Sequence, residues 1–420
     1  MENDSRRTFI KKSSLAAAGI GLASSLPYSM YARVAPSDQI NIGVIGLGFG
    51  MVNMRKMLDG TPSVRCVALC DVDKVILENE AAGLKKDYPD ATGNLKLYSD
   101  FRKLLDNKDI HGVIIATPDH WHTYVYAEAT KAGKAIYIEK PTGHSIADCN
   151  LMIDLQKKYQ NVVTTGLWHV SLEYFIDAFK ILESGVLGNV YKVHTWITKD
   201  EKPLVYTTPQ EIPNTFDYKM WQGHAENHPY AQERIDNWRF FWPYGGGRQT
   251  DWLHYLDSAF DGLMALGYKR AYPRSVFSAG YRKPGSMMEA PAGQTTIYEF
   301  DNYQIVWEHQ VTGMYGRGDG VAWIGSNGTL VCNRMGYEVI PKKVDKKDVI
   351  EAVRVDGPYG NQYNHMVNWA QCIKDNNPNT NSPISKGSFV SAVACMGNIS
   401  YQVGTSLEYL PEENRFKNNP

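Results

Sequence analysis

One lysine of the chain stands where it could act as an acid or a base. This lysine belongs to the triplet Glu139-Lys140-Pro141, which follows an apolar run, residues 135–138, that is typical of a buried strand. Proline disfavours the helical conformation for the residue before it, so Lys140 should extend from the end of that strand. An ammonium group there could polarise a carbonyl or share the proton of a substrate hydroxyl. A surface lysine beside a turn is the alternative, and the predicted position at a ligand crevice favours chemistry.

A second group of polar residues follows the glycines at 245–247. Asp251, His254 and Asp257 are three residues apart, so on one helix they would lie near a single face. A neutral imidazole can take or return a hydroxyl proton near pH 7, and a carboxylate can orient the ring. A core histidine held by a carboxylate is the alternative. The presence of Lys140 favours the catalytic interpretation.

A glycine-rich turn follows the first apolar run, residues 39–45, which predicts a strand. Gly46, Gly48 and Gly50 form the turn, and a segment of helical character comes next. Glycine lets the backbone turn tightly beneath a pyrophosphate, and free N–H groups at a helix N-terminus bind that anion. Met51 occupies the usual position of the third glycine, with Gly50 one residue early. The helix–strand contact should therefore differ from that of the standard fingerprint.

An aspartate follows the next predicted strand, residues 64–69. Asp71 lies twenty-five positions after Gly46. A carboxylate at such a strand end can accept both ribose hydroxyls and would repel a 2′-phosphate, which favours NAD over NADP. A turn or helix-capping aspartate is the common alternative. The order of strand, glycine turn, helix, strand and acid favours the cofactor interpretation.

The elements that would position these residues alternate between strand and helix. Strands are predicted at 95–98, 112–116 and 135–138, with helices at 100–106 and 122–132 between them, which indicates a doubly wound parallel sheet. Loops at the carboxyl ends of such strands line the ligand crevice. The loop expected near the nicotinamide contains Thr117, Pro118, Asp119, His120, Trp121 and His122. His120 or His122 could instead cap the next helix, and we expect catalysis from neither.

The second half of the chain has a different pattern. Long aromatic-rich strands are predicted at 190–198, 295–300 and 303–309, which indicates a large, open, mostly antiparallel sheet. One face of such a sheet needs a partner, so we expect a homo-oligomer, a dimer or tetramer, formed through it. The aromatic residues between 221 and 244 could floor a sugar site or pack the domain junction. The predicted fold class is α/β, with a Rossmann domain over residues 36–161 and an α+β domain for substrate binding and oligomerisation over residues 162–420.

Taken together, these motifs resemble the Gfo/Idh/MocA family of oxidoreductases. The landmarks that carry the resemblance are the glycine turn, Asp71, the 117–122 loop, Glu139-Lys140-Pro141, Gly185-Val186-Leu187-Gly188, Trp238-Arg239, the glycines at 245–247 with Asp251, His254 and Asp257, and the segment 363–373. The motifs are specific to the family and not to a substrate.

The resemblance implies a role for each of three residues. Lys140 would be the catalytic lysine, His254 would address the substrate hydroxyl, and Asp251 would be the acidic partner of that histidine. Two departures stand out: the gap between Asp251 and His254 is three rather than four, and Trp168-His169-Val170 replaces a polar Gln-x-Arg. The expected cofactor-binding residues are Gly46, Gly48, Phe49, Gly50, Asp71, Thr117, Pro118, His120, Trp121, His122, Glu139 and Lys140.

Residues 1–35 predict an export signal. Arg6-Arg7 precedes Phe9, two lysines and an apolar run, residues 15–26, that is too short to span a bilayer. This pattern resembles a twin-arginine signal, so we expect a periplasmic or otherwise exported protein. No cysteine lies near the end of the run, so no lipid anchor is expected. A cytoplasmic protein with an amphipathic leader is the alternative.

The overall composition limits the classes of partner. Lys+Arg 44 against Asp+Glu 45 gives a net charge of −1, which disfavours nucleic acid or an anionic bilayer as a partner. None of the six cysteines lies in a CxxC pair or at zinc-ligand spacing, so neither a metal site nor a redox dithiol is expected.

The sequence favours an NAD-dependent oxidoreductase acting on a sugar or cyclic polyol. The alternative is a glycosidase of the same fold, which oxidises a ring carbon transiently, expels the aglycone by elimination and then returns the hydride. Outside the cytoplasm free NAD is scarce, so a retained cofactor needs a closed redox cycle. The glycosidase closes that cycle, and so does hydride transfer between two sugars. A sugar-binding module without activity is disfavoured because Lys140 and His254 are both present.

Overall fold

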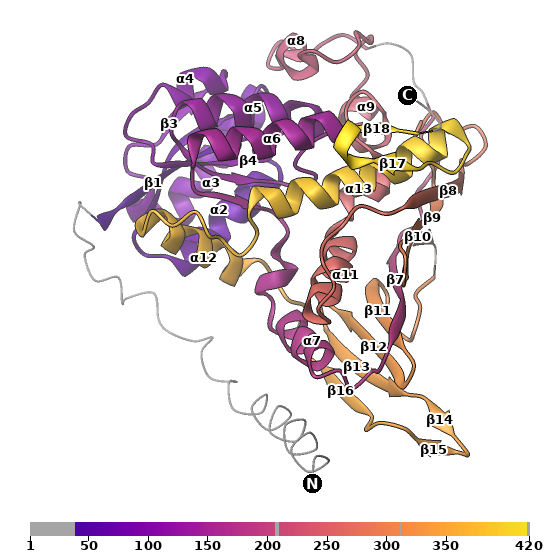
Figure 1. Ribbon diagram of the computed structural model, residues 1–420. Helices are drawn as coiled ribbons and strands as arrows, with labels where there is room; N and C mark the ends of the chain where they lie inside the picture. Colours follow the sequence, from indigo (N-terminus) through magenta and orange to yellow (C-terminus); the bar gives the residue numbers. More distant parts are fainter. Residues whose placement is uncertain (1–37, 206–209, 311, 418–420) are drawn as a thin grey trace.

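The first unit of the protein is built on a six-stranded parallel sheet (Figure 1). The computed structural model describes residues 38–205, 210–310 and 312–417. The strand order is β3-β2-β1-β4-β5-β6. The strands are β1 (Ile40–Ile45), β2 (Val64–Cys70), β3 (Lys96–Tyr98), β4 (Gly112–Ile115), β5 (Ala135–Ile138) and β6 (Val163–Thr165). The predicted doubly wound parallel sheet is confirmed.

Helices cover both faces of this sheet because its central strands are apolar on both sides. They are α2 (Phe49–Gly60), α3 (Lys74–Asp87), α4 (Phe101–Leu105), α5 (Asp119–Lys131), α6 (Ile146–Tyr159) and, from the end of the chain, α12 (Tyr363–Lys374). In β4, Val113 and Ile115 pack with α4, α5 and α6, whereas Ile114 packs with α2, α3 and α12. Successive side chains of a strand point to opposite faces, so an uninterrupted apolar run serves both layers.

The second unit is an eight-stranded sheet of order β16-β13-β12-β11-β7-β10-β9-β8. Its neighbouring strands are antiparallel except for the parallel pair β7 and β10, so the mostly antiparallel sheet is also confirmed. The strands are β7 (Val190–Thr198), β8 (Ser275–Tyr281), β9 (Gly293–Glu299), β10 (Gln304–Gln310), β11 (Gly320–Gly325), β12 (Gly328–Asn333), β13 (Gly336–Pro341) and β16 (Val353–Asp356).

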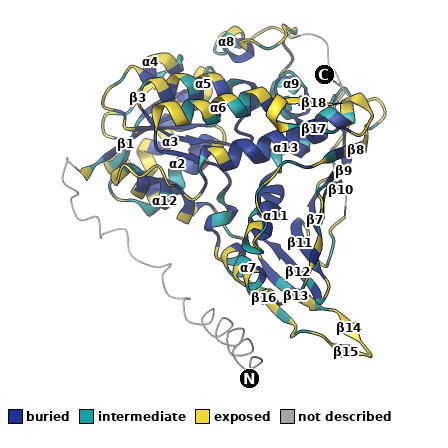
Figure 2. Cartoon of the chain, in the orientation of Figure 1, coloured by how far each residue is buried: buried dark blue, intermediate teal, exposed yellow. Residues whose placement is uncertain are grey.

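One face of the large sheet packs against α7 (Glu173–Glu183), α11 (His254–Ala265) and α13 (Ile384–Val403), which are buried on their inner sides (Figure 2). Trp307 and Trp323 are fully buried there. A Cβ at Gly262 would lie 2.3 Å from Trp323 Nε1, so only glycine lets α11 approach the sheet this closely. On the other face, Met314 and Tyr315 pack against a small apolar cluster centred on Trp196.

The remaining elements are short. They are α8 (Tyr218–Gln222), α9 (Gln232–Asp236), α10 (Gly247–Asp251), the 3₁₀ turns η3 (Pro89–Ala91), η4 (Trp168–Ser171), η5 (Trp238–Phe240) and η6 (Pro411–Glu413), and the two-stranded pairs β14 (Lys343–Val344) with β15 (Lys347–Asp348) and β17 (Tyr409–Leu410) with β18 (Arg415–Phe416).

The chain crosses between the two units more often than the sequence suggested. Strand β6 belongs to the first sheet, so that sheet extends beyond the expected boundary at residue 161. Helix α12 returns to the first unit, where Met366 and Trp369 join the core beneath α2. Helix α13 runs along α6 and β8, and Ser391 Oγ accepts a hydrogen bond from the backbone N–H of Thr142 at 3.0 Å. The end of the chain therefore fixes the two units against each other.

Across the described residues, no helix is both long enough and apolar enough to cross a membrane. The predicted export signal, residues 1–35, lies outside the described residues.

Candidate active site

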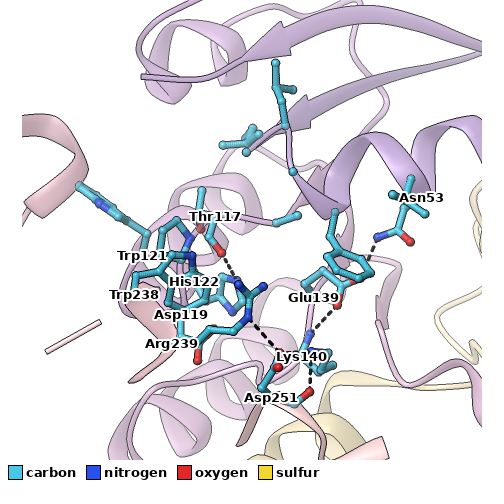
Figure 3. A pocket seen from close by; sticks show the side chains of 18 of the residues that line it. Asn53, Thr117, Asp119, Trp121, His122, Glu139, Lys140, Trp238, Arg239 and Asp251 are labelled. Atoms are coloured by element: carbon cyan, nitrogen blue, oxygen red, sulfur yellow. Dashed lines mark hydrogen bonds and ion pairs between the residues drawn. The ribbon is translucent and has the colours of Figure 1, made fainter. Parts of the chain in front are cut away.

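A cavity of about 930 Å³ opens at the carboxyl ends of β1, β2, β4 and β5 and extends to the second unit. Side chains from the two units meet across it (Figure 3). Carboxyl ends of parallel strands are the usual ligand edge of a doubly wound sheet. The residues expected in the glycine turn, the 117–122 loop and the Glu139-Lys140-Pro141 triplet fall at this edge.

The glycine turn forms an open cradle at the end of β1. Gly46 has φ +85°, and a Cβ there would lie 2.5 Å from the carbonyl oxygen of Ala116. A Cβ at Gly50 would lie 2.8 Å from Val44 Cγ1, so Gly50 provides the close helix–strand contact that the third glycine of the fingerprint usually provides. A Cβ at Gly48 would meet nothing within 4 Å, and no side chain caps α2. The first N–H groups of α2 are therefore free to bind a pyrophosphate.

Asp71 lies at the end of β2 and lines the cavity. Its Oδ2 accepts from the N–H of Leu47 at 2.9 Å and its Oδ1 from the N–H of Asp73 at 3.0 Å. Burial raises the pKa of Asp71, and these backbone donors oppose the rise. A carboxylate has about four acceptor sites, so lone pairs remain for two ribose hydroxyls. The residues present thus fit a dinucleotide.

Ten of the twelve expected cofactor residues line the cavity. They are Gly46, Gly48, Phe49, Asp71, Thr117, Pro118, Trp121, His122, Glu139 and Lys140. Gly50 lies behind it as a packing residue. His120 turns away, with Nε2 3.0 Å from the carbonyl oxygen of Trp221 and its ring against Trp221 and Tyr244. The structure thus gives His120 a packing position.

His122 lies between two backbone carbonyls. Nδ1 is 2.6 Å from the oxygen of Pro141 and Nε2 is 2.9 Å from that of Thr117. Burial lowers the pKa of His122 to about 4, so the ring is neutral at pH 7 and donates to one carbonyl at a time. This arrangement joins the loop after β4 to the loop after β5 and leaves no ring nitrogen for a substrate.

Lys140 reaches from the end of β5 across the junction of the two units. Its Nζ donates to Asp251 Oδ1 at 2.9 Å and to the carbonyl oxygen of Asp251 at 2.6 Å (Figure 3). The neighbouring Glu139 is buried, and its Oε1 accepts from Asn53 Nδ2 at 2.7 Å. Lys140 therefore lies at the crevice, as predicted, and its contact with Asp251 holds the ammonium in the cavity.

The Asp251 carboxylate forms ion pairs with three cationic side chains. Besides Lys140, Arg239 Nε lies 3.0 Å from Oδ1 and Arg248 Nη1 lies 2.8 Å from Oδ2. Burial alone would raise the pKa of Asp251, but the positive charges of Lys140, Arg239 and Arg248 outweigh it and hold that pKa well below its usual range. The carboxylate is therefore ionised at any pH at which the protein would be assayed.

We expected residues 251–257 to lie on one helix, but the structure has two helices with a break between them. Helix α10 ends at Asp251, and α11 begins at His254. The break frees the carbonyl of Asp251 for Lys140 and directs Asp257 away from the cavity. Asp257 is fully buried against Lys386 Nζ at 3.1 Å, so it fixes α11 to α13 and is no part of the site.

His254 lines the cavity without the partner expected for it. Its Nε2 donates to the carbonyl oxygen of Gly166 at 3.1 Å, and its Nδ1 is buried with no hydrogen-bond partner among the described residues. The Asp251 carboxylate binds the three cations instead of this ring. Burial, with the charges of Arg334 and Lys140, lowers the pKa of His254 well below its usual value, so the imidazole is neutral. In this arrangement Lys140 is better placed than His254 to exchange a proton with a substrate.

The buried neutral histidines lead to a stability prediction. Burial lowers the pKa of His120 to about 3 and that of His365 to about 4. As the pH falls below about 6.5 the unfolded chain binds protons at these rings, and the folded chain does so only near pH 4. The free energy of unfolding should therefore fall steadily between about pH 6.5 and pH 4. Urea unfolding at a series of pH values measures this.

His365→Asn is expected to make this fall shallower, since it removes one such ring away from the cavity. The control is His111→Asn, which changes an exposed ring and should keep the wild-type slope. A free energy of unfolding that is constant from pH 7.5 to pH 4.5 would contradict the assignment of neutral buried rings.

Three residues of the cavity, Asn53, Trp252 and Arg334, belong to none of the sequence motifs described above. Trp168, Trp238 and Trp252 supply aromatic faces, Asn53 holds Glu139, and Arg334 enters from the turn between β12 and β13. Of the aromatic residues between 221 and 244, Trp221, Trp238 and Phe240 line the cavity, and the Arg239 guanidinium lies 4.3 Å from the ring centre of Trp238. Trp221 also packs with Phe241 and Tyr244 in an apolar cluster that Trp238 contacts. The segment therefore packs the junction of the two units and also supplies rings to the cavity wall. Within the described ranges no group of three or more His, Cys, Asp or Glu side chains could hold a metal ion.

Segments from both units that line the cavity match known protein families. Residues 40–167 match the family described as oxidoreductase family, NAD-binding Rossmann fold, and residues 157–261 match oxidoreductase family, C-terminal alpha/beta domain. The first unit is therefore an NAD-binding domain, in agreement with the prediction of NAD. Together the two matched segments extend over more than half of the chain.

Individual relatives are more distant. The chain is 28% identical over 183 residues to an inositol 2-dehydrogenase of Salmonella typhimurium, covering 43% of this chain and 52% of the relative. It is 31% identical over 166 residues to a glycosyl hydrolase family 109 protein of Solibacter usitatus, covering 38% of each. These alignments thus span about half or less of the curated relatives. Levoglucosan dehydrogenase in complex with NADH and levoglucosan has a similar fold, with a TM-score of 0.64 at 17% identity over 88% of this chain and 99% of that one.

Proposed function

The chain belongs to the Gfo/Idh/MocA family of oxidoreductases, and from this premise we propose that it transfers hydride between NAD and the hydroxyl-bearing carbon of a sugar or cyclic polyol. The observation that carries the proposal is the position of Lys140. Its ammonium lies at the ligand edge of the NAD-binding domain and contacts Asp251 of the second unit. A sugar bound between the units would meet this group and the dinucleotide together.

In this proposal the cofactor supplies the hydride acceptor, and the protein handles the proton and the geometry. The cradle at Gly46 and Gly48 would hold the pyrophosphate, and Asp71 the ribose of the adenosine half. The ammonium form of Lys140 would give a proton to the carbonyl oxygen during reduction, and its neutral amine form would take the hydroxyl proton during oxidation. Asp251 holds the Lys140 side chain in the cavity, since it accepts from Nζ through both its carboxylate and its carbonyl oxygen.

The surrounding side chains would orient the sugar. Trp168, Trp238 and Trp252 offer flat faces to C–H groups, and Arg239 offers donors to hydroxyls. His254 is neutral and its Nε2 donates to the carbonyl oxygen of Gly166. In the proposal this ring shapes the cavity wall, and its Nδ1 would accept a hydrogen bond from a substrate hydroxyl.

The second candidate is the glycosidase of the same fold. The similarity to a glycosyl hydrolase family 109 protein supports it, and the proposed export of the protein supports it further because a closed redox cycle needs no free NAD. The two candidates differ in their net products. Purified protein without added NAD is incubated with polyols, free sugars and aryl glycosides, while absorbance at 340 nm and aglycone release are recorded.

A lasting rise at 340 nm with a free sugar or polyol, without aglycone release from glycosides, is expected for the oxidoreductase. Aglycone release with no lasting absorbance change would establish the glycosidase instead. Absence of both signals across the panel, from protein shown by mass spectrometry to hold NAD, would contradict both candidates.

Asp71→Asn is expected to weaken NAD binding about tenfold or more while leaving NADP binding unchanged or improved. The variant removes the charge that would repel a 2′-phosphate and one set of acceptors for ribose hydroxyls. Fluorescence titration of the apoprotein with each dinucleotide measures the ratio. The control is Asp154→Asn, at an exposed residue of α6 outside the cavity, and it should leave the ratio unchanged. An unaltered preference in Asp71→Asn would remove Asp71 from the ribose site.

Two further proposals concern the whole protein. We propose that residues 1–35 direct export by the twin-arginine route, and replacement of Arg6-Arg7 by Lys-Lys with cell fractionation tests this. We also propose a homo-oligomer formed through the open face of the large sheet, where Tyr191, Phe277 and Tyr281 are exposed. Light scattering on the purified protein tests it, and a monomer at micromolar concentration would contradict it.

A further inference from the structure

Arg334 places a guanidinium group in the cavity wall without a carboxylate partner. It occupies the two-residue turn between β12 and β13, is 9% exposed, and lines the cavity opposite the NAD-binding domain. Among the described residues no Asp or Glu lies within ion-pair distance of it, whereas Arg239 and Arg248 both pair with Asp251. A buried unpaired charge costs free energy unless a ligand or partner compensates it.

The hydrogen bonds of Arg334 leave most of its donors free. Nε donates to His169 Nε2 at 2.9 Å, and Nη1 donates to the hydroxyl of Tyr359 at 2.6 Å. A guanidinium has five N–H donors, so three remain, two of them on Nη2. Neither partner is a carboxylate: because Nε2 of His169 accepts, Nδ1 carries the proton and donates to Ser258 Oγ at 3.0 Å. These hydrogen bonds hold the Arg334 guanidinium in place and leave its positive charge without an anionic partner.

Aromatic rings surround the same guanidinium. It lies 4.5 Å from the ring centre of Trp168 and 5.1 Å from that of Trp252, and the ammonium of Lys199 lies 5.3 Å from the Trp252 ring. Lys199 also lines the cavity and has no ion-pair partner among the described residues. Cation–π contacts offset part of the cost of burying Arg334 but do not neutralise its charge. The wall therefore presents an indole surface beside one fixed positive charge, with a second cation at the exposed rim.

We propose that the substrate is a sugar acid, a uronate or aldonate, whose carboxylate binds the free donors of Arg334 while its ring lies against Trp168 and Trp252. This inference rests on the proposed function and narrows its substrate class. One buried guanidinium matches a monoanion, and a guanidinium fork fits the two oxygens of a carboxylate. A phosphate ester near neutral pH carries close to two charges and would call for a second buried cation that is free of a carboxylate, whereas Lys140, Arg239 and Arg248 already pair with Asp251.

The test compares sugars that differ only at one carbon. NAD-loaded protein is assayed at 340 nm with glucuronate against glucose and galacturonate against galactose, with gluconate and glucose 6-phosphate as further arms. In parallel, binding of glucuronate and glucose is measured by tryptophan fluorescence. The acid of a pair is expected to have a kcat/KM at least tenfold higher and to bind correspondingly tighter. A preference for the neutral sugars, or for the phosphate ester over every carboxylate, would overturn the proposal.

Arg334→Met removes the charge and keeps an apolar stem of similar length. We expect it to lower kcat/KM for the preferred acid by about 10- to 100-fold and that for its neutral counterpart by less than about threefold, which is the loss of a charge-assisted hydrogen bond. Arg334→Lys, which keeps the charge, should recover part of the preference. Arg282→Met, at an exposed arginine of the β8–β9 loop, is the matched control and should behave as wild type. Equal losses for acid and neutral sugar in Arg334→Met would contradict the anion site.

Failure of the anion site and failure of the oxidoreductase function would give different results. If glucuronate binds in an Arg334-dependent manner but no sugar changes the absorbance at 340 nm, the proposed oxidoreductase function fails and the anion site stands. If neutral sugars are oxidised and Arg334→Met does not alter the choice, the function stands and the anion site fails.

Discussion

Lys140→Met is expected to lower kcat by about three orders of magnitude and to leave NAD affinity within about a factor of two. Methionine keeps the length of the side chain and removes the only group of Lys140 that can carry a proton. A positioned acid or base contributes about 10²–10⁴-fold to a proton-transfer step, and the hydroxyl proton must move whenever hydride does. The ammonium touches Asp251 and no residue of the pyrophosphate cradle, so dinucleotide binding should persist. Initial rates at saturating sugar and a fluorescence titration with NAD measure the two quantities.

The matched control for this variant is Lys157→Met. Lys157 lies on α6 with its side chain 71% exposed and pairs only with Asp154. It should have wild-type kcat and wild-type stability, since exposed pairs contribute little. A Lys140→Met enzyme with near-normal kcat would remove Lys140 from the proton transfer. A matching loss of NAD affinity would make it a cofactor ligand instead.

Asp251→Asn is expected to lower kcat/KM by about 100-fold or more and the free energy of unfolding by about 3 kcal/mol. Breaking a buried ion pair by removing one partner leaves uncompensated charge, and here three cations lose their shared anion. The amide can still accept one hydrogen bond, so Lys140 is displaced rather than released. Steady-state kinetics and urea unfolding at pH 7.5 measure the two effects. Asp154→Asn, at an exposed pair, should change neither.

The pH dependence of this difference has a defined sign. The cations keep the folded-state pKa of Asp251 well below the usual value, near 4, that it has in the unfolded chain. The stabilising contribution is therefore complete above about pH 4 and is lost as the pH falls further. The difference in unfolding free energy between wild type and Asp251→Asn should be constant from pH 8 to pH 5 and should shrink below pH 4. A difference that instead grows with acid would contradict the ion-pair assignment.

The strands of the first unit were predictable because burial on both faces leaves a continuous apolar signal. β5 lies at the predicted residues 135–138, and β1, β2 and β4 differ from their predictions by one residue at an end. The positions of the residues at the strand ends were predictable for the same reason, since the sheet determines where its carboxyl edge lies. Lys140, Asp71 and the 117–122 loop therefore fall at the cavity.

The partner of Lys140 was not predictable from spacing. A helical face carrying Asp251, His254 and Asp257 was expected, but the helix breaks after Asp251 and the three residues take separate partners. The reason is tertiary: Lys140, 111 positions earlier in the chain, takes the Asp251 carbonyl that a continuous helix would have used. Local periodicity carries no information about a hydrogen bond between two units.

The contacts of Arg334 were also not predictable from the sequence. It stands in a hairpin turn, where an arginine is ordinary, and it belongs to no sequence motif. Its significance comes from Trp168, His169 and Trp252, which lie some 80 to 170 positions away and meet it only in the folded chain. Trp168-His169, noted as a departure from the family pattern, is one half of that contact.

The most direct test of the central claim is a crystal structure of the protein with NAD bound. We expect a pyrophosphate on the N-terminus of α2 at Gly46 and Gly48, a ribose on Asp71, and the nicotinamide within about 5 Å of Lys140 Nζ, with space beside Trp168 for a pyranose. A nicotinamide directed out of the cavity, or separated from Lys140 by protein side chains, would contradict the account.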